Sequence, residues 1–267
     1  ARHGASFLAK RQWDVHHGGF AWCVDPAGHP VGDRPGDKHA YGIAFGIYAS
    51  VAAHRATGDA QFLDLASLAF AWLDRHAHDA QHGGYFEVLL PDGTPVLTDT
   101  PGNDAIGTRF GRKSMNTHIH LLEAFSALHH ARPDRAVRAR LQEVFEIVRD
   151  RVYTEPGYLT LYFSPDWQPV PGRDSFGHDV ETAYLLTEAA ATLGMPDDVR
   201  TWQVARRLVD HALAVGYDHD RGGFYSEGAP DGRDLDTDKI WWVQAEGLNA
   251  LLLMHERFGE HDRRYWR

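Results

Sequence analysis

The stretch DAQHGGYFEVLLPDGTPV, residues 79–96, decides the fold because the chain contains four versions of it. Each version consists of a turn, a short aromatic strand and a second turn. The other three lie at residues 14–31, 155–170 and 218–232, with their glycines at Gly19, Gly157 and Gly223, against Gly84 here. A pattern that recurs about every 70 residues indicates one supersecondary unit used repeatedly.

Pairs of helix-like segments fill the intervals between these hairpins. Residues 41–59 carry apolar side chains at helical spacing and end in Thr57-Gly58-Asp59, a C-cap glycine followed by an N-cap aspartate for the next helix. A helix is also expected to end before Trp13. The further expected helices are 114–131, 134–152, 177–193, 197–215 and a last one from about 238 to 258.

Short links between helices make antiparallel neighbours, and a ring of such pairs is an α/α barrel. The predicted fold is therefore all-α, of the (α/α)6-barrel type, with short β-hairpins at one rim. We expect one domain over residues 1–267. The sequence supplies three full helix pairs, the end of one helix and one final inner helix, so the barrel is expected to be incomplete.

The first helix of each pair carries polar groups where a core-facing helix would carry apolar ones. Asn116 and His120 are four residues apart and lie on one face of their helix, while His118 points the other way. Unpaired buried polar groups cost about 1–3 kcal/mol, so such a face indicates a cavity. We expect Asn116 and His120 to line a site and His118 to be structural.

The other inner helices offer comparable residues near their N-terminal ends. His178 and Glu181 share one face, Trp242 and Glu246 share another, and Tyr41 opens the first helix. Taken singly, each has a structural interpretation, such as a dipole-complementing Glu or a packed Trp. Their common place in the repeat predicts a shared site. His and Glu three apart could chelate a metal, but no second pair accompanies them, and we predict no metal.

Composition limits the class of partner. The net charge of −10 argues against a nucleic-acid or anionic-membrane surface, which needs clustered Lys and Arg. Aromatic residues at 12% are compatible with a sugar site, because sugar C–H faces pack on aromatic rings, but the filling of a large helical core would account for them as well. No segment is apolar enough for a membrane span or a secretory signal, and Cys23 is the only cysteine. We therefore expect a cytoplasmic monomer or homodimer.

Three segments closely resemble hallmark motifs of the cellobiose 2-epimerases, within the N-acylglucosamine 2-epimerase superfamily of (α/α)6 barrels: KSMNTHIHLLEA (113–124), FGHDVETAYLL (176–186) and KIWWVQAE (239–246). HAYGIAFGIYASVAAHRATGD (39–59) resembles a fourth. The resemblance runs along nearly the whole chain. It implies reversible inversion at C2 of a reducing-end aldose without metal, nucleotide or redox cofactor.

The resemblance also implies roles for the candidate residues. His178 would be one of two acid–base histidines that exchange the C2 proton, with Glu181 binding or orienting the sugar. A neutral His suits this task because its pKa is close to the operating pH. Asn116 and His120 would hold hydroxyls or the developing enediolate. Trp242 would supply a stacking wall and Tyr41 a polar edge. Glu246 is added from helical spacing alone, as a further contact.

Two departures from the family pattern stand beside this likeness. An upstream Arg that binds sugar oxygens and a C-terminal segment with a Trp and the second catalytic His are not in this sequence. One reading is an incomplete view of a longer protein, which we favour because an open barrel would expose apolar helix faces. The other is a shortened relative.

Three further functions stay open. An aldose–ketose isomerase would use the same enediolate and return the proton to C1. A glycoside hydrolase on an α/α barrel would need two carboxylates, for which Glu181 and Glu246 are available. A non-catalytic sugar-binding protein is the third.

Overall fold

The computed structural model describes residues 1–98 and 101–266, and its helices group into two compact units. Unit 1 comprises residues 1–144 and 163–168, and unit 2 comprises residues 145–162 and 169–267.

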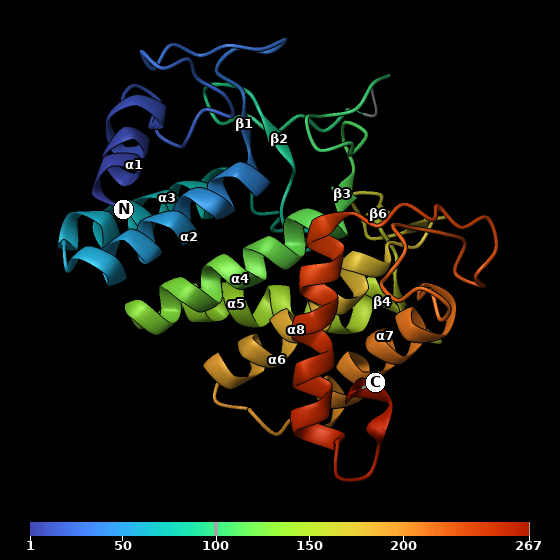
Figure 1. Cartoon of the computed structure of the whole chain (residues 1–267). Coiled ribbons are helices and arrows are strands. Elements are labelled where there is room, and N and C mark those ends of the chain that lie inside the picture. The colour runs from blue at the N-terminus through green and yellow to red at the C-terminus, as the bar shows by residue number, and fades with distance from the viewer. Residues whose placement is uncertain (99–100, 267) are drawn as a thin grey trace. The chain divides into compact units, whose positions relative to one another are not determined.

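Unit 1 is built on helix hairpins (Figure 1). Helix α1 (Arg2–Phe7) runs into a π-helical turn (Leu8–Gln12), and α2 (Ala40–Thr57) packs against α3 (Ala60–His76) and α4 (Met115–Ala131). The link between α2 and α3 has the expected caps: Gly58 adopts a left-handed φ of 70°, and the Asp59 side chain accepts the Gln61 N–H. Helix α5 (Arg135–Ile147) and a π-helical turn (Val148–Val152) lead from unit 1 into unit 2.

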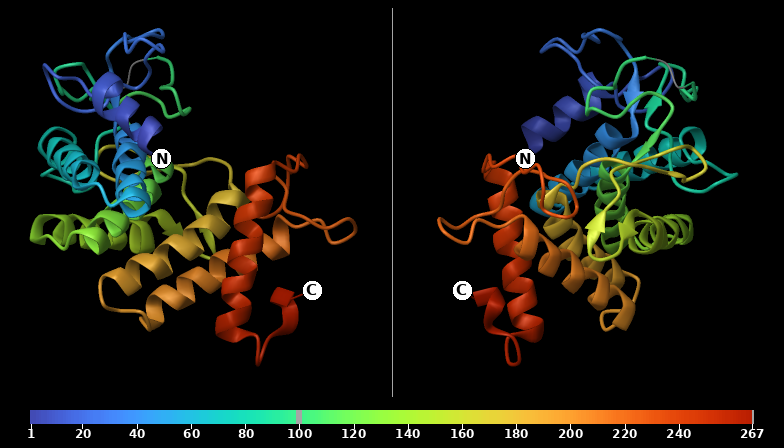
Figure 2. Two further views of the ribbon diagram at one scale, coloured as in Figure 1. Left: turned by 60° about the vertical axis from the view of Figure 1, so that its left-hand side comes forward. Right: turned by 90° about the vertical axis from the view of Figure 1, so that its right-hand side faces the viewer.

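Unit 2 repeats the same plan. Helix α6 (Phe176–Thr192) packs against both α7 (Val199–Val215) and α8 (Trp241–Phe258). The 3-10 turn at Arg263–Trp266 folds back along α8, as Figure 2 shows. The expected helices are thus present, each within a few residues of its predicted ends.

Strands are short throughout. They are β1 (Lys38–His39), β2 (Val88–Leu89), β3 (Lys113–Ser114), β4 (Tyr153–Thr154), β5 (Tyr158–Leu159), β6 (Tyr162–Phe163) and β7 (Pro169–Val170). Within the units, β1 pairs with β2 and β4 pairs with β5, both antiparallel. Single bridges form the predicted hairpins elsewhere: Trp13 with Phe20, His78 with Tyr85, and Tyr217 with Phe224.

A lysine ties three of these hairpins to the inner helix of the same repeat. Lys38 Nζ lies 2.9 Å from Asp14 Oδ2, Lys113 Nζ 2.7 Å from Asp79 Oδ2, and Lys239 Nζ 2.7 Å from Asp218 Oδ2. The aspartates also accept backbone N–H groups of their own turns, as Asp79 does from Gln81 and His82. Each hairpin is therefore fastened by one ion pair where its helix begins.

Candidate functional site

The inner helices α2, α4, α6 and α8 can be compared position by position from their first residues. Their second residues are Tyr41, Asn116, Gly177 and Trp242, and their sixth residues are Phe45, His120, Glu181 and Glu246. The six residues predicted to bind the sugar thus occupy only two positions of the repeat. His178 is the third residue of α6 and so occupies neither of these two positions.

We call Tyr41, Asn116 and His120 of unit 1 the first set, and His120 makes the ring contacts within it. Its ring lies edge-on to Tyr41 with centroids 5.1 Å apart, and 4.7 Å from the ring of Phe45. The Nδ1 atom lies 3.2 Å from Glu123 Oε2, one turn along α4. His120 is 8% exposed, and this carboxylate and the two rings are among its contacts. Phe45 and Glu123 contact His120, although the sequence analysis did not select them.

Asn116 belongs to the same helix and has an unsatisfied side-chain oxygen. Its Oδ1 atom is buried and has no hydrogen-bond partner among the described residues. A buried carbonyl without a donor costs about 1–3 kcal/mol, which a ligand hydroxyl would recover. This is the property expected of a residue that holds a sugar.

His118 is turned into the interior of unit 1. It is fully buried, donates from Nδ1 to the Ser114 carbonyl at 2.7 Å and accepts the Tyr85 N–H at Nε2 at 3.0 Å. Burial lowers the pKa of His118 to about 3. Both nitrogens are used by the backbone, in agreement with the structural role expected for this residue.

We call His178, Glu181, Trp242 and Glu246 of unit 2 the second set. His178 lies in the first turn of α6. Its Nδ1 atom lies 2.7 Å from Ser175 Oγ, and its ring lies 5.0 Å from that of Trp242. If Nδ1–H donates to the serine, Nε2 carries the lone pair that a base needs. Trp242 occupies the space left by Gly177, since a Cβ there would lie 2.6 Å from Trp242 Cη2.

The two carboxylates of the second set are half-buried on their helices. Glu181 lies one turn after His178 on α6, and Glu246 one turn after Trp242 on α8. Of the residues selected from the sequence, Tyr41, Asn116 and His120 thus lie in unit 1, and His178, Glu181, Trp242 and Glu246 lie in unit 2.

A cluster of ionisable groups lies beside the first set. Within the described part of the chain, His39, Glu87 and Asp104 bring their nitrogen and oxygen atoms within 4.8 Å of one another. His39 Nε2 lies 3.0 Å from Asp104 Oδ2, while Glu87 accepts the Ser114 N–H at 2.7 Å and the Thr117 hydroxyl. Burial raises the pKa of Glu87 to about 7. His39 and Asp104 also line a cavity of about 340 Å³.

These donor types could hold a divalent cation, but their hydrogen bonds argue otherwise. His39 Nδ1 accepts the Tyr41 N–H at 3.1 Å, so it is deprotonated and the ring proton of a neutral His39 sits on Nε2. That N–H points at Asp104, in the place where a metal bond would form. The cluster fits a network that caps α2 and α4, the helices of Tyr41 and His120, better than it fits a metal centre.

A second buried acid cluster lies at the start of α6. Asp174 and Asp179 are both fully buried; His211 Nε2 lies 3.2 Å from Asp174 Oδ2, and Leu159 N–H donates to Asp179 Oδ1 at 3.0 Å. Burial, with the neighbouring Asp174, raises the pKa of Asp179 well above its usual range. Neither cluster was predicted, because their members come from separate segments that one sequence does not connect.

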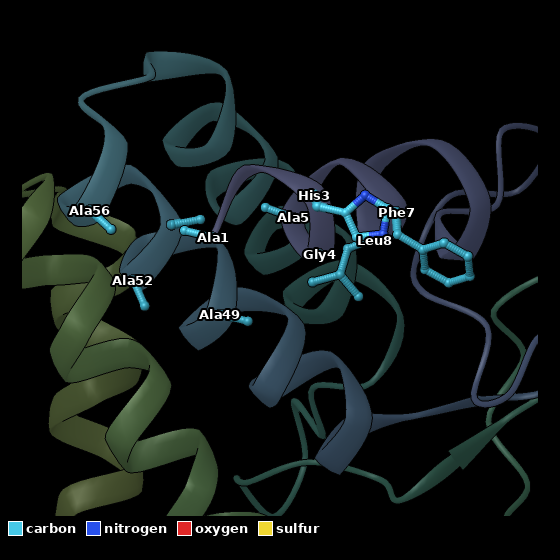
Figure 3. A pocket seen from close by; sticks show the side chains of 10 residues that line it. Ala1, His3, Gly4, Ala5, Phe7, Leu8, Ala49, Ala52 and Ala56 are labelled. Atoms are coloured by element: carbon cyan, nitrogen blue, oxygen red, sulfur yellow. The ribbon is translucent and has the colours of Figure 1, made fainter. Parts of the chain in front are cut away.

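A cavity of about 720 Å³ lies elsewhere in unit 1. It is formed by α1 and by the Ala49, Ala52 and Ala56 face of α2, and Figure 3 shows His3 as its one polar side chain. Binding sites usually combine apolar walls with several placed polar groups. This cavity lacks them, so we do not assign the site there.

Comparison with known proteins places these features in context. The family described as N-acylglucosamine 2-epimerase matches residues 1–267. A cellobiose 2-epimerase of Bacteroides fragilis is 29% identical over 97% of this chain and 65% of its own length. A D-mannose isomerase of Marinomonas mediterranea is 26% identical over 96% of this chain and 63% of its own length. The chain thus spans just under two thirds of these curated relatives.

Solved structures agree on the fold. The cellobiose 2-epimerase of Spirochaeta thermophila superposes with a TM-score of 0.83 at 35% identity, covering 97% of this chain and 63% of the other. A family 76 glycoside hydrolase of Bacteroides thetaiotaomicron reaches a TM-score of 0.70 at 12% identity, over 98% of this chain and 66% of the other, a likeness of fold alone. The fold class is that of the α/α barrels, as predicted. In the described residues no helix combines the length and apolar character needed to cross a membrane.

Proposed function

Because the chain belongs to the N-acylglucosamine 2-epimerase family, we propose that it inverts C2 of a reducing-end aldose. The substrate is a β-1,4 disaccharide of the cellobiose or lactose type, or mannose and glucose. The observation that carries the proposal is the setting of His178, with Nδ1 on Ser175 Oγ and its ring beside Trp242.

The reaction uses His178 as the base. Once the sugar ring has opened, Nε2 removes the proton from C2, alpha to the aldehyde, and leaves an enediolate. An acid on the opposite face, which the resemblance places in a segment outside this sequence, returns a proton to C2 and gives the epimer. The hydrogen bond from Nδ1 to Ser175 would hold the imidazole in the tautomer that accepts this proton.

The other candidate residues are assigned to binding. Asn116 has a buried Oδ1 without a donor, which suits a sugar hydroxyl. His120, oriented by Glu123, would hold an oxygen of the substrate, and Tyr41 would pack beside it. Trp242 would give a wall for the sugar, while Glu181 and Glu246 would accept hydroxyl protons. We assign no metal or cofactor to these steps.

Aldose–ketose isomerisation is the second candidate. Relatives that match nearly the whole chain include D-mannose isomerases, 26% and 27% identical. The same enediolate yields a ketose when the proton returns to C1 and an epimer when it returns to C2. The two reactions therefore share His178 and differ in product.

The test is incubation of the protein with cellobiose, lactose, mannose and glucose in deuterated water, followed by NMR. Deuterium at C2 of a new epimer supports epimerisation, and a ketose supports the second candidate. His178→Asn should lower turnover by about 100-fold or more, because it removes the base. His219→Asn, at an exposed hairpin of the same unit, is the control. Exchange in none of the sugars, or full turnover by the His178 variant, would refute the proposal.

A further inference from the structure

The repeat that carries His178 departs from the others at one position. Two residues before the inner helix, the first, second and fourth repeats have Lys38, Lys113 and Lys239, each paired with an aspartate of its hairpin. The third repeat has Asp174 there. A carboxyl group has replaced a cation, so this hairpin must be fastened to its helix in another way.

A second fastening is common to three repeats. The fourth residue of the inner helix accepts a backbone N–H from the second strand of the hairpin: His118 from Tyr85, Asp179 from Leu159 and Gln244 from Phe224. The distances are 3.0, 3.0 and 2.8 Å. We call this contact the hairpin clasp.

Two of the three clasp residues are uncharged. Gln244 is an amide, and it also donates from Nε2 to the Phe224 carbonyl. His118 is neutral, since one ring nitrogen donates to Ser114 and the other accepts from Tyr85. Asp179 is the clasp residue that can carry charge, in a fully buried place where an unpaired carboxylate is costly.

Counting donors and acceptors shows what Asp179 requires. Asp179 Oδ1 takes the Leu159 N–H, and Asp174 Oδ2 takes the N–H of His211. The two remaining oxygens, Asp179 Oδ2 and Asp174 Oδ1, are buried and have no donor. The two carboxyl groups nevertheless lie in hydrogen-bond contact with each other. One proton between them satisfies both orphaned oxygens.

We propose that Asp179 is a positioning residue that acts as a neutral acid, donating from Oδ2–H to Asp174 Oδ1 and so fixing the first turn of α6. Asp179 directly follows His178, and the catalytic meaning of this placement rests on the proposed function. The shared proton takes the place of the lysine of the other repeats. It links Asp179, which holds the hairpin, to Asp174 in the segment before α6. Asp174 is itself held by two backbone hydrogen bonds with Gly228.

The charged surroundings of the pair are few. From α7, His211 faces Asp174, and its ring lies tilted against that of Tyr158 of β5 with centroids 5.9 Å apart. Arg173, next in the chain, is paired with Glu227 at 2.6 Å on the surface. Loss of the shared proton would leave two adjacent buried carboxylates that repel each other. The first turn of α6 should then loosen, and the orientation of His178 with it.

The direct test is the ¹³C chemical shift of the Asp179 carboxyl in aspartate-labelled protein. At pH 7 it should report a protonated acid, and it should titrate only on the alkaline side. The ¹H–¹⁵N shifts of the His178 ring should change over the same range. An ionised Asp179 at pH 7 would overturn the proposal. These measurements need no turnover, so they stand even if the protein epimerises no sugar.

Two substitutions distinguish the effect of the shared proton from the effect of removing the side chain. Asp179→Asn keeps an oxygen for Leu159 and supplies a permanent N–H for Asp174, so it should retain kcat and abolish the alkaline change at His178. Asp179→Ala should lower kcat by about 10- to 100-fold with little change in KM, through misplacement of the base. Asp198→Asn, at the N-cap of α7, is the control and should do neither. An Asp179→Asn protein as impaired as Asp179→Ala would contradict the neutral acid.

Discussion

His118 of α4 and Gln244 of α8 stand at the same turn of their helices and accept the same kind of hydrogen bond. The donors are the N–H groups of Tyr85 and Phe224, each bridged to the opposite strand of its hairpin. An imidazole and an amide are interchangeable here because both offer an uncharged acceptor. The equivalence allows the electrostatics of the clasp to be tested without removing it.

His118 should make unit 1 sensitive to acid. Its pKa is lowered from 6.5 to about 3, mainly by burial, so between these values the unfolded chain binds more protons than the folded one. The contribution to stability is complete above pH 6.5 and is lost as pH falls toward 3, by at most about 5 kcal/mol. Urea unfolding between pH 4 and 8 measures it. His118→Gln should flatten this slope, and an unchanged slope would exclude His118 as its source.

Glu87 should act in the opposite direction. Its pKa is raised from 4.5 to about 7 by burial, so the folded protein binds the extra proton between these values. Its contribution is present below pH 4.5 and is lost as pH rises through 7, by up to about 3 kcal/mol. Glu87→Gln should remove the decline in unfolding free energy over this range. Glu256→Gln, on the exposed face of α8, should leave it in place.

The buried lysine of the second repeat should matter more than its exposed counterpart. Lys113 is fully buried and binds Asp79 and the Gly83 and Pro165 carbonyls. Lys113→Ala should lower the unfolding free energy by about 3–5 kcal/mol, because it leaves the Asp79 charge buried alone. Lys239 is 31% exposed, so Lys239→Ala should cost about 1 kcal/mol or less. Equal losses in the two variants would show that burial does not set the cost.

Gly177 should control the place of the Trp242 ring. A Cβ at this position would lie 2.6 Å from Trp242 Cη2, so Gly177→Ala must displace the indole from His178. We expect a changed tryptophan fluorescence, a loss of about 1–3 kcal/mol from overpacking, and a lower turnover of any sugar that the protein converts. Gly4→Ala has no atom within 4 Å of the added Cβ and serves as control. Unaltered fluorescence would mean that the ring accommodates the methyl group in place.

The sequence predicted what depends on local chemistry. Gly58 and Asp59 end one helix and start the next through caps that involve near neighbours, and the helical period alone separated His118 from the face of His120. Contacts between distant segments were missed. Asp174 meets His211 and Glu87 meets Thr117 across long stretches of chain, and no spacing rule connects them.

One repeated signal was present in the sequence and was overlooked. A lysine precedes three of the inner helices by two residues, at Lys38, Lys113 and Lys239, and aligning the helix starts reveals Asp174 as the exception. The same alignment places Gly177, rather than His178, level with Tyr41 and Asn116. Equivalent positions in the repeats are therefore found more reliably by aligning the N-terminal ends of the helices than by aligning their apolar faces.

The hairpin clasps have a consequence for hydrogen exchange. The amides of Tyr85, Leu159 and Phe224 belong to short strands flanked by turns, where exchange with solvent is ordinarily fast. Each is held by a side chain rooted in an inner helix, so its proton can leave only when that helix end opens. These three amides should thus serve as reporters: their exchange rates in loop segments would measure the opening of α4, α6 and α8 one helix at a time.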